Sequence, residues 1–393
     1  MTNLNWLNGI PRFKRSAIRP RIDAVAEVKA LSVGGLDTAA SIRIDLGPTH
    51  PASAGLLRGT LTLSGDVVVA LDPQPGALHR GAEMIFAARD LRQALTLANR
   101  HDWQAPFFGE WVLARCVEDA LGLHVPPRAA WLRAALAEHH RIASHLAHLS
   151  FVGFHAGRSE LGTGGVREVL RQCLAELTGN RVHPMAVRLG GVGFDPTPRW
   201  LAAERSGVRA ASELARRLTD AAALGRGVAV VRQEHVDAFG LAGPVARASG
   251  VLTDLRRAAG EEPYTTTLDE APPDAPTAGD AAARFAWLAA EVVESAALVE
   301  RLLDNLPAGP LAAHLPKVVK LPEGDAVAAV EAPLGRAGVV ITSRGEKTPW
   351  RLRLRTASAA NVSAWPAVVP PVRLIDLPVA LASLGWVAGD LDK

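Results

Sequence analysis

The sequence is poor in cysteine and has no long apolar run. Its 393 residues include only 2 Cys, Cys116 and Cys173, which excludes a disulfide framework and any metal site built on two cysteine pairs. No apolar stretch approaches the roughly 18 residues that cross a bilayer, and the N-terminus lacks the apolar core of a signal peptide. We therefore expect no transmembrane helix, and we expect both cysteines to be core residues.

Neither sign of charge dominates the chain. The 43 Lys and Arg residues against 40 Asp and Glu leave a net charge of +3, which is too small to indicate nucleic-acid binding. Apolar residues make up 48% and charged residues 21%, the balance of a folded globular protein. At roughly 150 residues per domain, the length predicts two or three packing units.

Hydrophobic periodicity changes along the chain. Residues 1–40 carry a basic cluster without clear period, which predicts an extended basic tail. Residues 41–80 alternate apolar and polar positions around a turn at Ser64-Gly65-Asp66, a β-hairpin pattern. Residues 81–310 have the period of long helices with short connections, typical of a bundle. Residues 311–393 predict a small β part, then a short apolar helix and an acidic tail. The expected fold class is α+β, mainly α.

The sequence predicts six helical segments in the bundle, several of them bounded by proline or glycine. We expect them from about Glu83 to Arg100, from Pro106 to Gly122, from Pro127 onward, from Val166 to Gly179, over Ser206–Leu224 and from Asp280 onward.

The 12 histidines raise the question of a metal site. His145 and His148 share one helix face, with Glu138 two turns earlier. However, no HExxH pattern occurs and no sulfur ligand is near, so helix-interior histidines are the favoured interpretation. The glycine clusters GTGG and LGGVG match no nucleotide fingerprint, and Walker and GxSxG motifs do not occur. The sequence thus predicts neither a metal nor a nucleotide site.

Polar residues gather instead where the expected elements meet. His50 lies in the proline-bracketed turn GPTHP, and Arg80 follows the hairpin in HRGAE. The motif NRHDW, residues 99–103, follows the first expected helix. Scaffolds usually carry function at such junctions, although composition alone would class these residues as caps and surface loops.

These motifs resemble those of the D subunit of the proton-pumping NADH–quinone oxidoreductases (respiratory complex I), a relative of the [NiFe]-hydrogenase large subunit. The similarity spans about residues 43–393 and includes GPTHPASAGLLRGTLTLSGDVV, HRGAE, EHHRIASHL, TGNRVHPMAVRLGGV, GLAGPVARASGVLTDLR and ASLGWVAGDLDK. It implies a [NiFe]-hydrogenase large-subunit-like helical bundle with small N-terminal and C-terminal β elements. The positions of the nickel-binding cysteine pairs read NRHDWQAP and VVPPVRLIDLP, so a nickel site is not supported.

The resemblance implies one component of an NADH:quinone oxidoreductase (a translocase), a component that is not catalytic as an isolated chain. It binds no cofactor itself and docks a B-like partner that holds the terminal [4Fe–4S] cluster. Quinone is the substrate in a chamber between the two, while NADH and FMN belong to other subunits. Further implied partners are C-like and I-like peripheral subunits and a membrane subunit at the quinone entry, on the cytoplasmic side of the bacterial cell membrane.

At the cluster end, the family's functional positions are matched. Arg80, Arg100 and His183 correspond to residues that approach the partner's cluster. Arginine is a permanent cation, which suits a cluster that gains negative charge on reduction. A nearby histidine can take up a proton together with the electron.

At the quinone end, the sequence departs from the family. Ala54 stands where the second histidine of the HPxxHG loop is expected, and Trp103 corresponds to the tyrosine that hydrogen-bonds the headgroup. The carboxylate that would pair with the missing histidine falls near Gly153–His155, where no acid occurs. The residues predicted to line the cavity are His50, Trp103 and His155.

Alternatives therefore stay open. If quinone is reduced here, we expect a different proton donor: His50, His101 or His155. A second hypothesis is a structural paralogue that has lost quinone binding. A third is a component of a hydrogenase-related ion-pumping complex with another electron acceptor.

Overall fold

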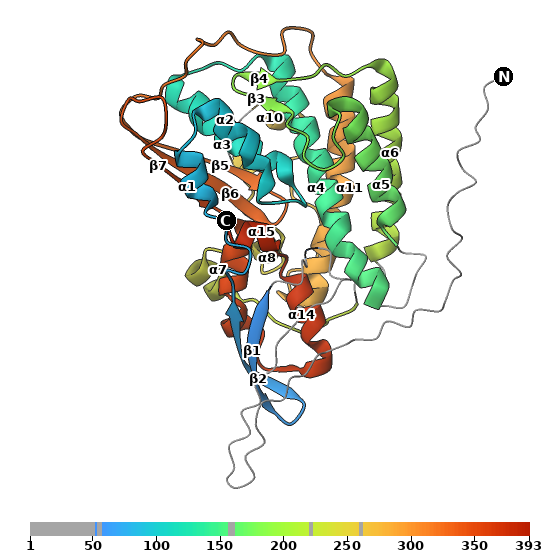
Figure 1. Cartoon of the computed structure of the whole chain (residues 1–393). Coiled ribbons are helices and arrows are strands. Elements are labelled where there is room, and N and C mark those ends of the chain that lie inside the picture. Colours follow the sequence, from blue (N-terminus) through green and yellow to red (C-terminus); the bar gives the residue numbers. More distant parts are fainter. Residues whose placement is uncertain (1–51, 53–56, 156–161, 220–222, 259–261) are drawn as a thin grey trace, which may run out of the picture.

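The computed structural model describes residues 52, 57–155, 162–219, 223–258 and 262–393 (Figure 1). The predicted tail, the first residues (41–51) of the predicted hairpin region and with them His50 lie outside the described residues, and the division of the chain into segments stays a prediction.

Long helices form the centre of the molecule, with α4 and α11 packed against each other and against α6 (Figure 1). They are α3 (Pro106–Leu121), α4 (Pro127–His155), α5 (Gly164–Thr178), α6 (Pro198–Thr219) and α11 (Ala281–Asp304). The predicted ends at Gly122 and Gly179 are confirmed, since both glycines adopt the left-handed conformation that closes a helix. The predicted start of α6 is wrong by two turns. Its first turns hold Trp200, whose buried indole donates to the Cys173 carbonyl at 2.9 Å.

The helix expected from Glu83 to Arg100 is interrupted. It consists of α1 (Ala82–Ala87), α2 (Leu91–Leu97) and a short 3₁₀ helix, η2 (Ala98–Arg100). Asp90 accepts a hydrogen bond from the Gln93 amide at 2.9 Å and thereby caps a new helix. The break turns η2 toward α3, against which it packs.

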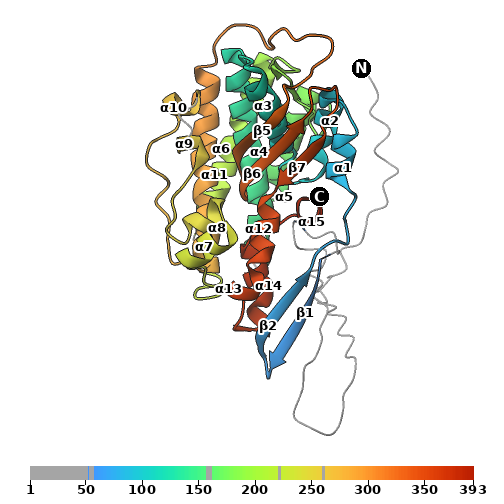
Figure 2. The ribbon, with the colours of Figure 1, turned by 90° about the vertical axis from the view of Figure 1, so that its left-hand side faces the viewer.

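Small antiparallel sheets flank the bundle (Figure 2). The predicted hairpin is confirmed as β1 (Arg58–Ser64) and β2 (Val67–Gln74), and β8 (Val372–Arg373) adds a third strand. The hairpin projects from one end of the bundle in both views (Figures 1 and 2). The predicted C-terminal sheet is confirmed as β5 (Gly324–Ala332), β6 (Gly335–Ser343) and β7 (Arg351–Arg355), with β5 and β6 packed on α3. A minimal pair joins β3 (Val187–Arg188) to β4 (Gly191–Val192).

Several short elements complete the fold. They are α7 (Gln233–Phe239), α8 (Gly243–Arg247), α9 (Leu255–Ala258), α10 (Tyr264–Thr267), α12 (Ala357–Ser363), α13 (Trp365–Val368), η4 (Leu374–Asp376), α14 (Leu377–Ser383) and α15 (Ala388–Leu391). The predicted short apolar helix near the C-terminus is α14, and the other short elements were not predicted, because they span too few residues to show a period. The predicted α+β, mainly α fold class is confirmed.

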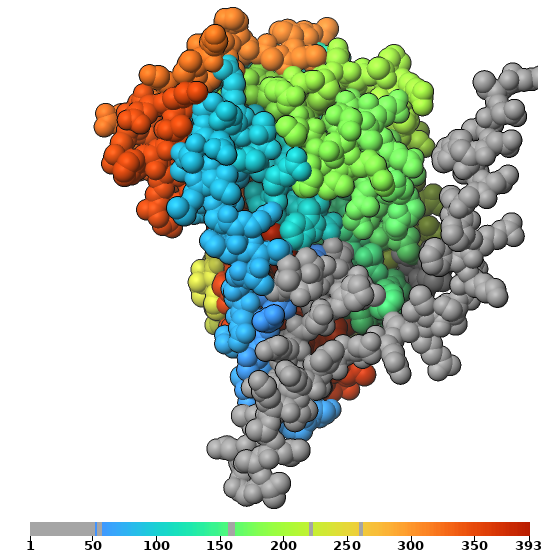
Figure 3. Space-filling view, in the orientation of Figure 1, coloured from blue at the N-terminus to red at the C-terminus, as the bar shows by residue number. Residues whose placement is uncertain are grey.

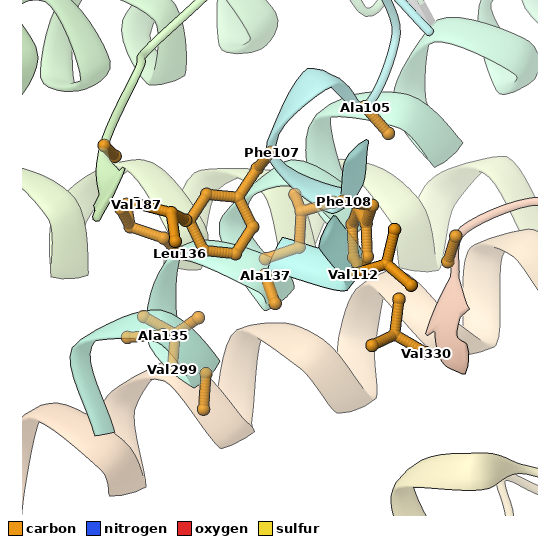
Figure 4. Packing of buried hydrophobic residues seen from close by; sticks show 14 of the residues in the cluster. Ala105, Phe107, Phe108, Val112, Ala135, Leu136, Ala137, Val187, Val299 and Val330 are labelled. Carbon is orange, nitrogen blue, oxygen red and sulfur yellow. The ribbon is translucent and has the colours of Figure 1, made fainter. Parts of the chain in front are cut away.

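The main core lies where α3 meets α4, α11 and β5 (Figure 4). Phe107 and Phe108 are at most 1% exposed, and their rings pack edge to face with 6.2 Å between the ring centroids. Burying one such ring stabilises the fold by about 1.5–3 kcal/mol. This packing holds α3, and with it the start of α3 beside the NRHDW motif, in a single position.

Buried charges connect the same elements. The Glu138 carboxylate on α4 accepts hydrogen bonds from four side chains: Arg141 at 3.1 Å, Arg256 at 3.0 Å, Tyr264 at 2.9 Å and Ser295 at 2.6 Å. These donors come from α4, α9, α10 and α11. One carboxylate therefore ties the loop that carries Tyr264, the only tyrosine of the sequence, to the bundle.

Candidate functional site

The structure brings Arg80, Arg100 and His183 together, although they are far apart in the sequence. Arg80 Nη2 donates to the Arg100 carbonyl at 3.2 Å. His183 Nδ1 donates at 2.8 Å to the carbonyl of Asn99, the residue before Arg100. Both arginines are exposed and His183 is half-buried. We call these three residues the cationic cluster.

The backbone around the cationic cluster is held by buried polar groups. Glu110 on α3 accepts from Asn99 Nδ2 at 2.7 Å and from the Val187 amide at 2.9 Å. Burial raises the pKa of Glu110, and those hydrogen bonds oppose the shift. Asn180 Oδ1 accepts from the His183 amide at 2.8 Å, which closes the turn in the NRVH motif. Glu110 thus connects η2 to the segment that carries His183.

The two guanidinium groups supply the positive charge of the cationic cluster, and the surroundings of His183 oppose its protonation. Desolvation lowers the pKa of His183, and the Arg100 guanidinium lowers it further, against the hydrogen bond to Asn99. In the space-filling view, the segment from β2 to α2 forms a continuous strip of the surface (Figure 3). A group that gains negative charge beside Arg80 and Arg100 is stabilised by the two guanidinium ions.

Trp103 lies against the C-terminal segment, where its ring is in contact with Gly389. Its half-buried ring packs against a small apolar cluster that includes Ala52, Leu334 and Val387. Ala52 is the described residue of the HPASAG motif, so Trp103 packs near this one residue of the motif. His50 itself lies outside the described residues.

His101 forms a buried pair with a residue that the sequence did not indicate. Its Nδ1 lies 3.0 Å from Asp390 Oδ1, and both side chains are less than 10% exposed. Asp390 Oδ2 accepts from the Ser358 amide at 3.1 Å. The favourable His101 interaction and these hydrogen bonds outweigh desolvation and lower the pKa of Asp390.

The expectation of an acidic tail at the C-terminus is therefore wrong. Asp390 and Asp392 are 5% and 7% exposed. Asp392 accepts from the amides of Gly76 and Leu78 at 2.7 and 2.9 Å, which fastens the chain end to the segment between β2 and α1. Buried carboxylates need such partners, and a reading of local sequence alone cannot supply them.

Asp102 lies between His101 and Trp103 in the sequence, and its side chain binds the backbone of the turn that precedes α3. Its Oδ1 accepts from the amides of Gln104 at 3.0 Å and Ala105 at 3.1 Å. Desolvation and the Asp390 carboxylate raise the pKa of this half-buried carboxyl group to about 7, against the opposing effects of His101 and the two amides. Asp102 therefore changes protonation near neutral pH.

His155 is the last residue of α4 and is exposed. Its ring lies 3.9 Å from that of Phe151, centroid to centroid. This contact lies within α4, so it does not by itself bring His155 to Trp103.

The other α4 histidines lie in the helix interior, as the sequence predicted. His139 pairs with Glu204 at 2.7 Å and His145 with Glu291 at 2.9 Å. His140 and His148 donate to the carbonyl four residues before each, at 3.0 Å. Among the described residues, no three His, Cys, Asp or Glu side chains form a group that could hold a metal ion. The predicted burial of Cys116 and Cys173 is confirmed.

None of the helices in the described ranges is long and apolar enough to cross a membrane.

Sequence comparison matches residues 162–320 and 315–393 to the family model described as respiratory-chain NADH dehydrogenase, 49 Kd subunit. A protein of Salinispora arenicola, named as the D 2 subunit of NADH-quinone oxidoreductase, is 41% identical over 94% of this chain and 99% of its own length. The D 1 subunit of the NADH-quinone oxidoreductase of Streptomyces coelicolor is 39% identical over 92% of this chain and 98% of its own.

A solved structure is also similar. It is titled as the membrane-bound sulfane sulfur reductase (MBS), an archaeal respiratory membrane complex. The matching chain is 29% identical, with a TM-score of 0.82 over 92% of this chain and 100% of that chain.

Proposed function

The chain belongs to the family of the 49 Kd subunit, or D subunit, of respiratory-chain NADH dehydrogenases, and we propose that it works in a complex I-type NADH–quinone oxidoreductase. In this proposal, it docks the partner that holds the terminal [4Fe–4S] cluster and forms one wall of a divergent quinone chamber. The observation that carries the proposal is the convergence of Arg80, Arg100 and His183 around η2.

The cationic cluster suits an electron-transfer partner. Arg80 and Arg100 stay charged at every physiological pH, so they stabilise the reduced, more negative state of a nearby cluster and raise its reduction potential. His183 can add a proton when the electron arrives. Buried Glu110 holds Asn99 and Val187, and so it limits how far these groups can move.

The proposed wall of the quinone chamber is the region around Trp103, which corresponds to the family's headgroup-binding tyrosine. Its indole N–H can donate a hydrogen bond to a headgroup carbonyl but cannot deliver a proton as a phenol can. His50 and His155 are the other proposed lining residues. The proton that quinone reduction consumes must then come from another group of this chain or from water.

Cofactors and partners follow from the same proposal. The chain holds no cofactor itself; the [4Fe–4S] cluster, FMN and the NADH site belong to other subunits. C-like and I-like peripheral proteins and a membrane subunit at the quinone entry are the further partners. The assembly would lie on the cytoplasmic side of the cell membrane.

A second proposal, a structural paralogue without a working quinone site, draws support from the packing of Trp103. The ring is in direct contact with Gly389, so part of the space beside it is filled. The similar fold in a complex titled as a sulfane sulfur reductase supports it too, because the same architecture then occurs with a different reaction. Saturable binding of a quinone analogue to the assembled complex separates the two proposals, since the paralogue should have no saturable site.

The cluster role is tested by a redox titration of the assembled complex. We expect Arg80→Ala to lower the midpoint potential of the partner's terminal cluster, because one cation is removed beside it. Arg199→Ala is the matched control: this arginine of α6 is 87% exposed and pairs with Glu176 on the surface. An unchanged potential in Arg80→Ala contradicts the proposed role.

A further inference from the structure

We propose that the outer face of the C-terminal sheet docks an acidic polypeptide segment of another subunit. The side chains that would contact this segment are Arg351, Arg353, Val327 and Val340, which we call the arginine–valine face. The cationic cluster and the region around Trp103 do not use this surface, so the inference is independent of the quinone chamber.

The C-terminal sheet has a buried inner face and an outer face that stays partly open. Inner side chains such as Val339, Ile341 and Leu352 are at most 1% exposed and belong to the main core. The residues between them project to the other side, because successive side chains of a strand alternate. On that outer side, Val327 is 67% exposed and Val340 is 38% exposed. In Figure 2 the sheet lies on the side of the molecule that faces the viewer.

The residues of the arginine–valine face are neighbours across the strands. Val327 pairs with Val340, and Val340 pairs in turn with Arg353, so one row of side chains crosses the sheet. Arg351 is exposed on the same side of β7, about 7 Å along the strand from Arg353. Neither guanidinium group forms an ion pair or a hydrogen bond with another residue in the described part of the chain.

The rest of the outer face is already covered by this chain. Glu331, near the end of β5, accepts a hydrogen bond from Arg247 of α8 at 2.7 Å. Arg355 on β7 donates to the carbonyl of Gly240, which ends α7, at 2.7 Å. The arginine–valine face is therefore the part of the outer surface that α7 and α8 leave open.

The edge of the sheet is less accessible than this face. Strand β7 is an edge strand, but its Leu354 amide donates to Glu83 Oε1 of α1 at 2.8 Å, and α1 packs along β7. A partner strand therefore cannot pair with β7 at this place. We expect the partner segment to lie across the face instead.

The charge of the face indicates what covers it. Desolvation and the Arg336 guanidinium lower the pKa of Arg355, against the effect of Glu331, so positive charges already crowd this side of the sheet. Arg351 and Arg353 add two more. Carboxylates from a partner would remove the repulsion among these cations.

The geometry of the face suits a polypeptide. A guanidinium group binds a carboxylate through two parallel hydrogen bonds. In an extended segment, side chains two residues apart lie about 7 Å apart, which matches the spacing of Arg351 and Arg353. The adjacent Val327 and Val340 offer an apolar contact, so the segment should carry acidic residues together with at least one apolar residue.

A uniformly anionic surface, such as a bilayer or a nucleic acid, fits the face less well. Glu323 and Asp325 are exposed at the start of β5, on the opposite edge of the same sheet. A phosphate-covered surface would meet these carboxylates as well as the arginines. A polypeptide segment can place its acids over β7 alone.

The test uses the assembled complex with p-benzoylphenylalanine in place of Val340, at the centre of the face. Illumination links this residue to whatever touches it, and mass spectrometry identifies the linked peptide. We expect a peptide of another subunit that contains at least two acidic residues close to the link.

Charge variants in the same background test the role of the arginines. Arg351→Glu combined with Arg353→Glu should lower the yield of the link about ten-fold, because like charges would then face each other. Lysine at both positions keeps the charge without the fork, so its yield should lie between these values. Arg216→Glu combined with Arg217→Glu is the matched control, since both arginines are exposed on α6, and it should give the wild-type yield.

Other outcomes overturn the proposal. A link to a second copy of this chain, or to a peptide without acidic residues, means a different occupant. If no polypeptide is linked, solvent or lipid covers the face, and binding of the purified chain to phosphatidylglycerol vesicles tells which. If the glutamate variant does not assemble, the peptide linked in the otherwise wild-type complex still decides. None of these outcomes depends on quinone reduction.

Discussion

Gly389 leaves no room for a side chain beside Trp103. A Cβ atom at this position would lie 2.3 Å from the indole ring and 2.5 Å from the His101 carbonyl. The C-terminal helix α15 can therefore approach η2 closely enough for Asp390 to reach His101 only because residue 389 is glycine.

We predict that Gly389→Ala destabilises the chain by about 1–3 kcal/mol, since the added methyl group must push α15 or the ring aside. Urea unfolding of the purified chain measures the effect. Gly165→Ala is the control, because a Cβ there meets nothing within 4 Å. Equal stability of Gly389→Ala and the wild type would contradict the close packing.

Glu138→Gln should be among the most damaging single changes in the bundle. The carboxylate is 0% exposed and neutralises Arg141 and Arg256. Breaking a buried ion pair on one side costs about 3–5 kcal/mol, because Arg141 then loses the carboxylate that it contacts, whereas Arg256 keeps Asp254 and Glu294. Glu234→Gln, in an exposed pair with Arg232, should leave the free energy of unfolding unchanged within error. Similar values for the two variants would refute the central role of Glu138.

Stability should fall as the pH drops below about 6.5. Burial lowers the pKa of His140 to about 3 and that of His148 to about 4, so the unfolded chain binds protons that the folded chain does not. Each histidine then contributes up to about 1.4 kcal/mol per pH unit, and the stability is fully present only above pH 6.5. We predict that His140→Leu reduces the slope of unfolding free energy against pH between 6 and 4.5. Exposed His314→Gln should keep the wild-type slope.

Asp102 should have the opposite pH effect. Its raised pKa means that the folded chain binds the proton more tightly, so the contribution of this group to stability is fully present below pH 3.8 and is lost as the pH rises to about 7. We predict that Asp102→Asn raises the melting temperature at pH 8.5 and raises it less at pH 5. Asp90 has a lowered pKa, through its bond from the Gln93 amide, so Asp90→Asn should lower the melting temperature at pH 8.5. The same sign for both variants at pH 8.5 would exclude the raised pKa of Asp102.

The long helices and the hairpin were predictable because their signals are local. Gly122 and Gly179 end helices through their own backbone conformation, and Ser64-Gly65-Asp66 closes the hairpin within a few residues. The break before α2 was missed, since a capping aspartate competes with a helical period that continues across it. Arg80, Arg100 and His183 were identified by family resemblance, and the structure then placed them around η2.

The amino-acid sequence by itself determined the fold class, the bundle helices and the absence of nickel-binding cysteine pairs, because each depends on residue type and short-range spacing. Only the tertiary structure decided that a chain end with the composition of a solvated acidic tail is buried. Asp390 meets His101 across 289 residues of chain, and nothing local to either residue encodes that meeting. Long-range packing sets which charges lose their water and which gain a partner, and for this reason it sets the protonation of Asp102 as well.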